Sequence, residues 1–486
     1  MRDTIYLAIE GFTPRNQTTC PTGGRAAPRF KLARYGTIGP QGSAIAVSLG
    51  GHVRLKQLAI VTHETIGARM AGPAIRALEL ARAMRPEVEP IIVSPRAVER
   101  DTDGIEARQY RPGEPESMAR ALAGADVLLV QGFTLHHFPG LVADPRPMVV
   151  DLYCPFHLEN LERRRLVETD AAARLLGAQV DLDVLLVQLS RGDFFICASE
   201  RQRDYWLGML SAAGRLSPST YEADPSASNM VAVVPFGIEA VPPSPGPPLV
   251  KGVRPGIGEG DRLVVWGGAV TDWQDPCTAI EAVCEAAQQI ERLRLVFPAT
   301  IPNPDLPPMK ALEKARKRAR ELGLLDRNVF FIDWVAYDER GRFLLEAEAG
   351  ISAHSPSLEA RYSWRTRMLD YIWASLPIVC TRGDDLSALV ESRGLGVAVD
   401  PGDHAGMARA LARVLGDGPF REECIRRIRA EQPHLVWRRV AEPLRRFAAA
   451  PWKAGAGLEA ALAAPAPARH RGLRRAARAI VRRLNR

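Results

Sequence analysis

The chain has 486 residues, and at roughly 100–200 residues per domain this length predicts two to four domains, each with its own core. Hydrophobic residues make up 46% and charged residues 25%, a composition that excludes a disordered or fibrous protein. The net charge of +8 arises in the last 18 residues, which hold eight arginines and no acidic residue, so the near-neutral remainder is not expected to bind nucleic acid.

The cysteines and the apolar runs indicate a cellular compartment. The seven cysteines are scattered and form no CxxC pair, so we expect reduced thiols and no thiolate metal site. No apolar run reaches the roughly 18–20 residues of a membrane-spanning helix, and the apolar stretch near the N-terminus is too short for a secretory signal. The sequence therefore predicts a cytoplasmic protein.

The first part of the chain changes character near residue 56. Residues 1–55 are rich in Gly, Pro, Thr and Arg and follow neither period, so we expect a disordered leader. After it, short β-branched runs alternate with amphipathic segments, a pattern typical of a parallel sheet that crossover helices bury on both faces. Strands are expected at 58–61, 90–94, 125–132, 148–153, 194–199 and 230–237, with helices from Pro73 and Glu200.

A proline-rich stretch, VPPSPGPP at 241–248, divides the chain, because proline neither donates to a sheet nor continues a helix. Beyond it the alternation restarts, with strands expected at 263–268, 293–299, 328–335, 350–356, 377–383 and 395–401, and helices at 276–290, 310–324, 343–348 and 365–376. The predicted fold is α/β, with two Rossmann-like doubly wound domains facing each other across a cleft. The expected divisions are a first domain over 56–241, a linker over 242–250, a second domain over 251–435, a closing helix over 436–450, and a low-complexity spacer with a basic tail over 451–486.

A glycine-bearing loop separates the first strand from the first helix. Ligands of open α/β sheets bind at the carboxyl ends of the strands, where glycines and a helix N-terminus expose backbone N–H groups. Gly67 and Gly72 fit such a substrate wall, or they only shape a tight turn. They do not have the GxGxxG spacing, which disfavours a dinucleotide-dependent hydride-transfer enzyme.

The segment SPSLEARYSWRTRMLDYIWASLPIVCTRGDDL at 355–386 is the most informative. Ser363 is expected to cap a helix whose first turn contains Arg365 and Arg367, and guanidinium groups at a helix start suit a pyrophosphate. Glu359 precedes them and can accept hydrogen bonds from sugar hydroxyls. The two arginines cannot share one helix face, and we favour Arg365 because it is nearer the helix start; alternatively, both lie on a solvated face.

Three segments resemble the GT-B glycosyltransferases, and among them glycosyltransferase family 4: the glycine loop with GPAIRALELARAM, VVWGGAVTDWQDPCTAIEAV, and LEARYSWRTRMLDYIWASLPIVCT. The resemblance covers roughly residues 56–447. It implies a nucleotide-diphosphate sugar donor in the second domain, an acceptor in the first, and an enzyme of class EC 2.4 that acts with retention and without metal or a permanently bound cofactor. The implied acceptor is a cell-envelope polysaccharide, a glycolipid or a natural product.

The match to that family has two departures. Its motif has two acidic residues with seven positions between them, and Asp370 matches the second, but the first position is Tyr362, so Glu359 is the nearest substitute. Gly267 and Gly268 stand where such enzymes often have Arg or Lys. The resemblance therefore implies donor contacts from Gly267, Gly268, Ser363, Arg365, Arg367 and Asp370.

Further candidates follow strands of the first domain. Asp151 ends a strand and is expected to orient the acceptor hydroxyl; alternatively it caps a loop. His63 and Glu64 leave the first strand, and His136 and His137 follow another, each as a candidate for the site or as a structural residue. We take Asp151, Glu359 and His63 as the catalytic candidates, and none has a metal-ligand spacing.

The basic tail places Leu473, Ala477, Ile480 and Leu484 at helical spacing among arginines. Such a helix suits an anionic membrane surface at the inner face of the plasma membrane; alternatively the tail is solvated. Two other functions remain open. One is a GT-B-type nucleotide-sugar epimerase, and the other is a catalytically silent relative that binds sugar nucleotides.

Overall fold

The structure is a computed structural model that describes residues 54–298 and 309–454. The expected leader and basic tail therefore lie outside the described residues. The six cysteines within the described ranges are all free thiols, as expected. None of the helices in those ranges is long and apolar enough to cross a membrane.

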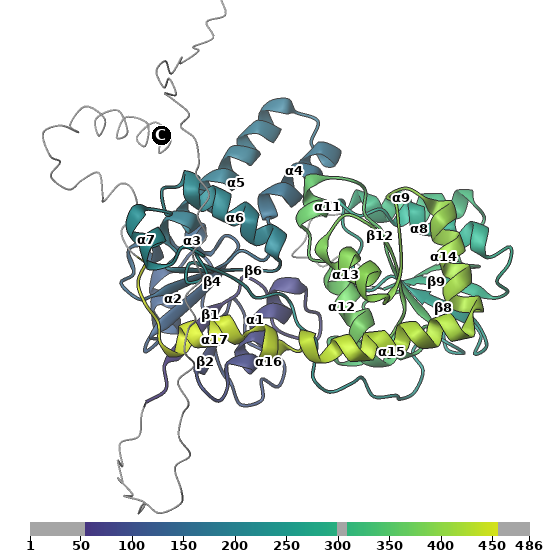
Figure 1. The fold of residues 1–486 in the computed structure, drawn as a ribbon, viewed down its shortest axis with the longest axis horizontal. Coiled ribbons are helices and arrows are strands. Elements are labelled where there is room, and N and C mark those ends of the chain that lie inside the picture. The colour runs from purple at the N-terminus through teal and green to yellow at the C-terminus, as the bar shows by residue number, and fades with distance from the viewer. Residues whose placement is uncertain (1–53, 299–308, 455–486) are drawn as a thin grey trace, which may run out of the picture. The chain divides into compact units, whose positions relative to one another are not determined.

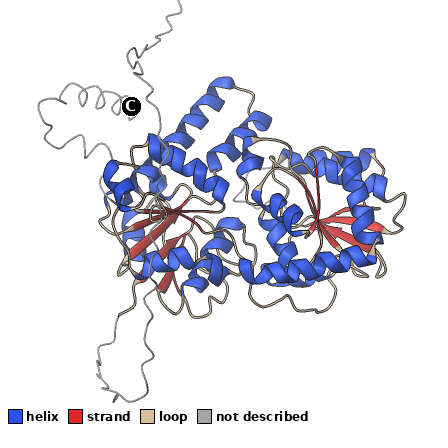
Figure 2. Ribbon diagram, viewed as in Figure 1, coloured by secondary structure: helices blue, strands red, loops and turns tan. Residues whose placement is uncertain are grey.

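The first sheet has seven parallel strands in the order β3-β2-β1-β4-β5-β6-β7 (Figures 1 and 2). Its central strands are continuous buried apolar runs, because helices cover both faces. Ile60 of β1 pairs with Ile92 on one side and Leu129 on the other. The strands are β1 (Gln57–Val61), β2 (Glu89–Ser94), β3 (Glu106–Gln109), β4 (Val127–Gln131), β5 (Met148–Asp151), β6 (Phe194–Cys197) and β7 (Val231–Val233).

The helices of the first half include several that the sequence did not predict, above all the paired helices α4 and α5. Asp170 caps α5 by accepting the N–H of Ala172. The elements are α1 (Gly72–Met84), α2 (Pro115–Ala121), α3 (Thr134–His137), η1 (Pro139–Ala143), α4 (Phe156–Val167), α5 (Ala171–Arg191), α6 (Glu200–Ala212) and α7 (Pro218–Ala223).

The second sheet has six parallel strands in the order β10-β9-β8-β11-β12-β13, which confirms the predicted pair of doubly wound α/β domains. The strands are β8 (Arg262–Val265), β9 (Leu293–Phe297), β10 (Val329–Phe331), β11 (Ala349–Ser352), β12 (Ile378–Thr381) and β13 (Gly396–Val399). The helices are α8 (Pro276–Ala286), α9 (Lys310–Glu321), η2 (Tyr337–Glu339), α10 (Arg340–Leu345), α11 (Leu358–Tyr362), α12 (Thr366–Trp373), α13 (Asp385–Arg393), α14 (His404–Gly416) and α15 (Gly418–Leu435).

The chain returns to the first half after α15. Helix α15 packs on α12, whereas α16 (Trp437–Val440) packs on α1 and α17 (Glu442–Ala449) on β7. The ring of Phe447 stacks on Phe194 with centroids 4.7 Å apart, and Ile238 forms a parallel bridge with Val436. The two halves are therefore connected both after β7 and after α15, as the yellow end of the ribbon in Figure 1 shows.

Candidate functional site

The carboxyl edge of the second sheet gathers polar groups from three adjacent strands. Strand β11 lies between β8 and β12, so the segments that follow these strands meet at one edge. The N–H of His354 donates to Oγ1 of Thr381 at 2.9 Å, which ties two of the segments together. In open α/β sheets this edge is where ligands bind.

Two short helices follow β11, and here one expectation is wrong. Ser357 caps α11 by accepting the N–H of Ala360, so Glu359 lies in a helix and not in a loop. Ser363 ends α11 and donates to the carbonyl of Ala360 at 3.3 Å, and Arg365 is the residue that precedes α12. Ser363 therefore does not cap the helix with the arginines, because the chain forms two helices there instead of one.

Arg365 is neutralised within the protein. Its guanidinium lies 2.6 Å from a carboxylate oxygen of Asp384, and both side chains are fully buried. It also donates to Oγ1 of Thr381 at 3.3 Å, while Asp384 accepts the N–H groups of Leu386 and Ser387 at the start of α13. The ion pair thus fastens α12 to α13.

Arg367 is buried and differs from Arg365 in having no acidic partner within ion-pair distance in the described ranges. One Nη donates to the carbonyl of Ala269 at 3.0 Å, and the guanidinium carbon lies 4.5 Å from the ring centroid of Trp266. The other Nη has no hydrogen-bond partner among the described residues. Burial, and after it the positive charge of Arg365, lower the pKa of Arg367 to about 10. A bound anion would supply a negative charge that stabilises the protonated guanidinium.

The glycines after β8 form the floor beside this cation. The Tyr371 hydroxyl accepts the N–H of Gly267 at 2.6 Å and lies within hydrogen-bond distance of the carbonyls of Val265 and Ile351. Gly268 has φ +77°, which L side chains rarely adopt, and open space where a Cβ would stand. Tyr371 therefore holds the loop at Gly267, while the space beside Gly268 is open.

Glu359 and His354 form an uncharged pair close to the arginines. Nδ1 of His354 lies 3.9 Å from Oε2 of Glu359, and within the described ranges neither atom has a hydrogen-bond partner. Burial raises the pKa of Glu359 to about 9, with a further rise from the carboxylate of Glu159 in the first half. Burial and the two arginines hold the pKa of His354 well below its usual range. Both side chains are thus neutral near pH 7.

Other buried polar atoms at this edge also lack partners. They are Nε1 of Trp266, Oγ of Ser352 and Nε1 of Trp364, in addition to those of Arg367, His354 and Glu359. Buried polar groups in proteins are nearly always hydrogen-bonded, so a cluster of unsatisfied ones calls for an explanation such as a ligand.

Asp370, the match to the second acidic position, belongs to a different network. Its carboxylate lies 3.4 Å from Arg340, which also pairs with Glu239 at 2.8 Å. The guanidinium of Arg340 stacks over Tyr337 and Trp373. Burial raises the pKa of Asp370, and Arg340 opposes that rise. Asp370 therefore contacts Arg340 rather than either predicted donor arginine.

In the first half, Asp151 is saturated by protein groups. It forms a bidentate pair with Arg76 at 2.5 and 3.0 Å, with both side chains fully buried, and accepts the N–H of Tyr153 at 3.3 Å. Arg76 also donates to the carbonyl of Val234 at 2.8 Å. Burial raises the pKa of Asp151, and Arg76 opposes the rise. The pair joins α1 to β5 and to the segment after β7.

The remaining first-half candidates lie on the loops after β1 and β4. The N–H of Ala74 in the first turn of α1 donates to Glu64 at 3.4 Å, so a protein carboxylate already faces that helix start. The ring of His63 packs beside Gly132, and burial and His137 lower its pKa. Gly67 lies beside Glu99, and Gly72 beside Phe236 and Tyr153; His136 and His137 end α3.

Helices α4 and α6 bring first-half residues to α11; the sequence predicts a helix from Glu200, where α6 begins, but α4 was not predicted. Gln202 donates to the carbonyls of Tyr153 at 2.9 Å and Tyr362 at 2.7 Å. The rings of Tyr205 and Tyr362 lie 4.8 Å apart. Burial raises the pKa of Glu159, whose carboxylate interacts with Glu359. The site thus receives residues from both halves.

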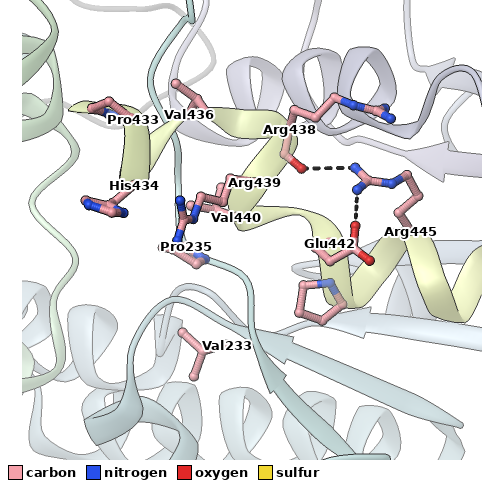
Figure 3. A pocket seen from close by; sticks show the side chains of 11 residues that line it. Val233, Pro235, Pro433, His434, Val436, Arg438, Arg439, Val440, Glu442 and Arg445 are labelled. Carbon is pink, nitrogen blue, oxygen red and sulfur yellow. Dashed lines mark hydrogen bonds and ion pairs between the residues drawn. The ribbon is translucent and has the colours of Figure 1, made fainter. Parts of the chain in front are cut away.

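A surface hollow of about 850 Å³ lies between the segment after β7 and helices α15 to α17 (Figure 3). Arg445 donates to the carbonyl of Arg438 at 2.9 Å and pairs with Glu442. None of the sequence-predicted site residues lines this hollow. The lining residues are Val233, Pro235, Pro433, His434, Val436, Arg438, Arg439, Val440, Glu442, Pro443 and Arg445.

Within residues 54–298 and 309–454, no three His, Cys, Asp or Glu side chains are grouped so as to hold a metal ion. The chain matches no family model and no curated protein. Its fold, however, matches solved structures of glycosyltransferases.

A sucrose-phosphate synthase from Thermosynechococcus elongatus is 14% identical over 81% of this chain and 98% of its own, with a TM-score of 0.56. WaaG, a glycosyltransferase involved in lipopolysaccharide biosynthesis, is also 14% identical, over 81% of this chain and all of its own, with a TM-score of 0.57. HepE from Anabaena, solved with UDP-glucose, is 12% identical over 80% of this chain and 99% of its own, with a TM-score of 0.57. The chain has the GT-B fold that these proteins share.

Proposed function

We propose that this protein is a glycosyltransferase that transfers a sugar from a nucleotide-diphosphate donor to an acceptor hydroxyl. The observation that carries the proposal is Arg367, a buried cation without a carboxylate partner, at the carboxyl edge of the second sheet. Structures with the same fold include glycosyltransferases, one of them solved with UDP-glucose, which supports a donor of that class.

The proposed donor site holds the diphosphate against Arg367 and the open glycine turn. A guanidinium Nη without a partner donates to a phosphate oxygen, and the start of α12 adds the positive end of its dipole. As the bond to the sugar breaks, negative charge grows on the leaving diphosphate, and a fixed cation in a dry site stabilises it. Arg365 does not contribute a free charge in this account, because Asp384 neutralises it.

The neutral pair of Glu359 and His354 suits the sugar. A protonated carboxyl both donates and accepts hydrogen bonds, and a neutral imidazole does the same, which matches hydroxyl groups. Their free atoms, Oε2 and Nδ1, face each other at 3.9 Å, a separation that a sugar hydroxyl bridges. We assign Glu359 to sugar binding rather than to charge stabilisation.

The acceptor approaches from the first half in this proposal. The acceptor oxygen bonds to the anomeric carbon, the bond from that carbon to the diphosphate oxygen breaks, and the acceptor proton passes to the leaving group or to solvent. Retention of configuration and independence of metal are part of the proposal, as the resemblance to family 4 implies. Because Asp151 is saturated, we do not assign it a proton-transfer role.

The test measures release of nucleoside diphosphate from UDP-, GDP- and dTDP-sugars, with and without an acceptor mixture of simple glycans and lipid-linked sugars. Acceptor-dependent release supports the proposal, and its loss in Arg367→Met but not in the exposed control Arg361→Met places it at this site. Conversion of the donor into its epimer, or binding without release under every condition, contradicts the proposal.

A further inference from the structure

Helix α5 is apolar on a face that no described residue covers. Its large apolar side chains stand exposed along much of its length: Leu175 73%, Leu176 67%, Val180 39%, Leu182 39% and Val187 37%. In Figure 1, α5 lies beside α4, which adds the half-exposed Leu161. Scattered exposed leucines are ordinary, but a row of them on one helix marks a surface with a partner.

The opposite face of the same helix already packs on the first half. Val184, Leu185 and Leu189 are buried there, together with Asp181. A surface helix normally has one apolar stripe, whereas α5 has a buried stripe and a second, exposed one. The exposed stripe is therefore additional to what the first sheet requires.

The charge around this stripe is close to balanced. From residue 156 to 193 the chain has seven carboxylates and five arginines, and Arg164, Arg165 and Arg191 are ion-paired with Asp181, Glu162 and Asp193. Asp183 stands exposed on the apolar face and accepts a hydrogen bond from Gln179 at 2.8 Å. The stripe therefore offers apolar surface and one exposed carboxylate to an amphipathic segment.

The chain leaves the described structure at the carboxyl end of α5. Trp452 packs on Phe194 and Phe447, with ring centroids 5.7 and 4.5 Å apart. Nζ of Lys453 lies 3.3 Å from a carboxylate oxygen of Asp193, and the N–H of Ala454 donates to its other oxygen at 3.1 Å. Asp193 comes two residues after the end of α5, so the last described residue, Ala454, lies next to that end.

The sequence beyond residue 454 has the required length and pattern. A spacer over 455–468 spans at most about 50 Å when extended, and α5, with 21 residues, is about 32 Å long. After the spacer, Leu473, Ala477, Ile480 and Leu484 recur at helical spacing among arginines, with no acidic residue. This is an apolar stripe with basic flanks, which suits the exposed apolar face of α5 and its carboxylate Asp183.

We propose that residues 473–484 bind the exposed face of α5 in the same chain, with the leucines against leucines and an arginine near Asp183. This docking is independent of the proposed enzymatic activity. It makes contact of the tail with a membrane, the other expectation for this segment, compete with contact to α5.

Photo-crosslinking in the full-length chain tests the docking. We place p-benzoylphenylalanine at Val180, irradiate, digest, and identify the crosslinked peptides by mass spectrometry. The expected product is an intrachain link to the peptide with Ile480, which is lost when Leu473, Ile480 and Leu484 are all replaced by Ser and reduced by Asp183→Arg. The same probe at Val253, an exposed apolar residue of the second half, is the control and yields no such link.

Three results overturn the proposal. The first is a crosslinked dimer, which assigns the face to a second copy. The second is the absence of a crosslink to the tail when the full-length chain carries the probe at Val180 and no other substitution. The third is a full-length chain that sediments with anionic vesicles while the yield of the crosslink from Val180 to the tail is the same with and without vesicles. Because no substitution in the design lies in the buried core of the first half, circular dichroism of each variant is expected to match the wild type.

Discussion

Two buried arginines, Arg76 in the first half and Arg367 in the second, differ in whether a carboxylate neutralises their charge. Arg76 has a bidentate carboxylate, Asp151, and a backbone carbonyl, so its charge is used up by the fold. Arg367 has one carbonyl and an aromatic ring, and no carboxylate in the described part of the chain. An arginine whose charge is neutralised by a protein carboxylate holds elements together, whereas a buried arginine without one, at a ligand-binding edge, has charge left for a substrate.

The largest change in stability is expected at the ion pair of Arg76 and Asp151. Arg76→Met leaves Asp151 buried without a cationic partner and is expected to lower the free energy of unfolding by about 3–5 kcal/mol, measured by urea denaturation. The double variant Arg76→Met, Asp151→Leu recovers much of that loss, because both charges are gone. A loss under about 1 kcal/mol in the single variant would show that the pair is not a structural link.

At Arg367 the expectation is the reverse, a loss of activity without a loss of stability. Arg367→Met is expected to lower turnover by about 100- to 1000-fold, the usual effect of removing one preorganised donor to a leaving group. The free energy of unfolding stays the same or rises, since a buried cation without a counterion has been removed. Steady-state kinetics and urea denaturation on the same preparation measure both quantities. Parallel loss of activity and stability contradicts the assignment.

The uncharged pair sharpens the comparison through pH. Glu359 keeps its proton in the folded protein up to a pKa of about 9 and releases it near its ordinary value when unfolded, so folding takes up a proton between these values. Stability therefore falls as pH rises from 7 to 9, by up to about 1.4 kcal/mol per pH unit from this group.

Glu359→Gln removes that dependence. As pH rises toward 9, the unfolding free energy of the wild type falls relative to that of the variant, so the difference between the two narrows or reverses. The lowered pKa of His354 acts only below about pH 6.5, where stability falls as pH falls, so His354 does not contribute to the slope between pH 7 and 9. Equal pH slopes in the two proteins would contradict a protonated Glu359.

The smallest effects separate the two glycine loops. Gly268→Ala forces a left-handed backbone onto alanine and is expected to cost about 1–2 kcal/mol. Gly72 begins a helix with its nearest neighbour 3.8 Å from a Cβ, so Gly72→Ala is expected to change stability by under about 1 kcal/mol. Thermal unfolding of both variants checks this; equal losses would show that the first loop is as constrained as the second.

Most strands and most helices of the second half follow from periodicity, because buried parallel strands are continuous apolar runs. Strand β3 was missed because its sequence, EARQ, is an exposed edge without β-branched residues. Helix α5 was missed because apolar residues lie on two faces, which obscures a 3.6-residue stripe.

The candidate site was predictable in its location but not in its charges. The helix start at Arg365 and the glycines after β8 mark the edge in the sequence. The choice between the two arginines depends on Asp384, a partner 19 residues from Arg365 that only the tertiary structure brings within 2.6 Å. Sequence reasoning favoured Arg365 because it is nearer the helix start, and the geometry favours Arg367 because Asp384 neutralises Arg365.

Calorimetric titration with UDP, GDP and dTDP of wild type, Arg367→Met and the exposed control Arg361→Met tests the central claim most directly. We predict that one of these nucleoside diphosphates binds wild type and the control alike and binds Arg367→Met about 100-fold more weakly, a difference of about 2.7 kcal/mol. Equal affinity for wild type and Arg367→Met would show that the diphosphate is held elsewhere.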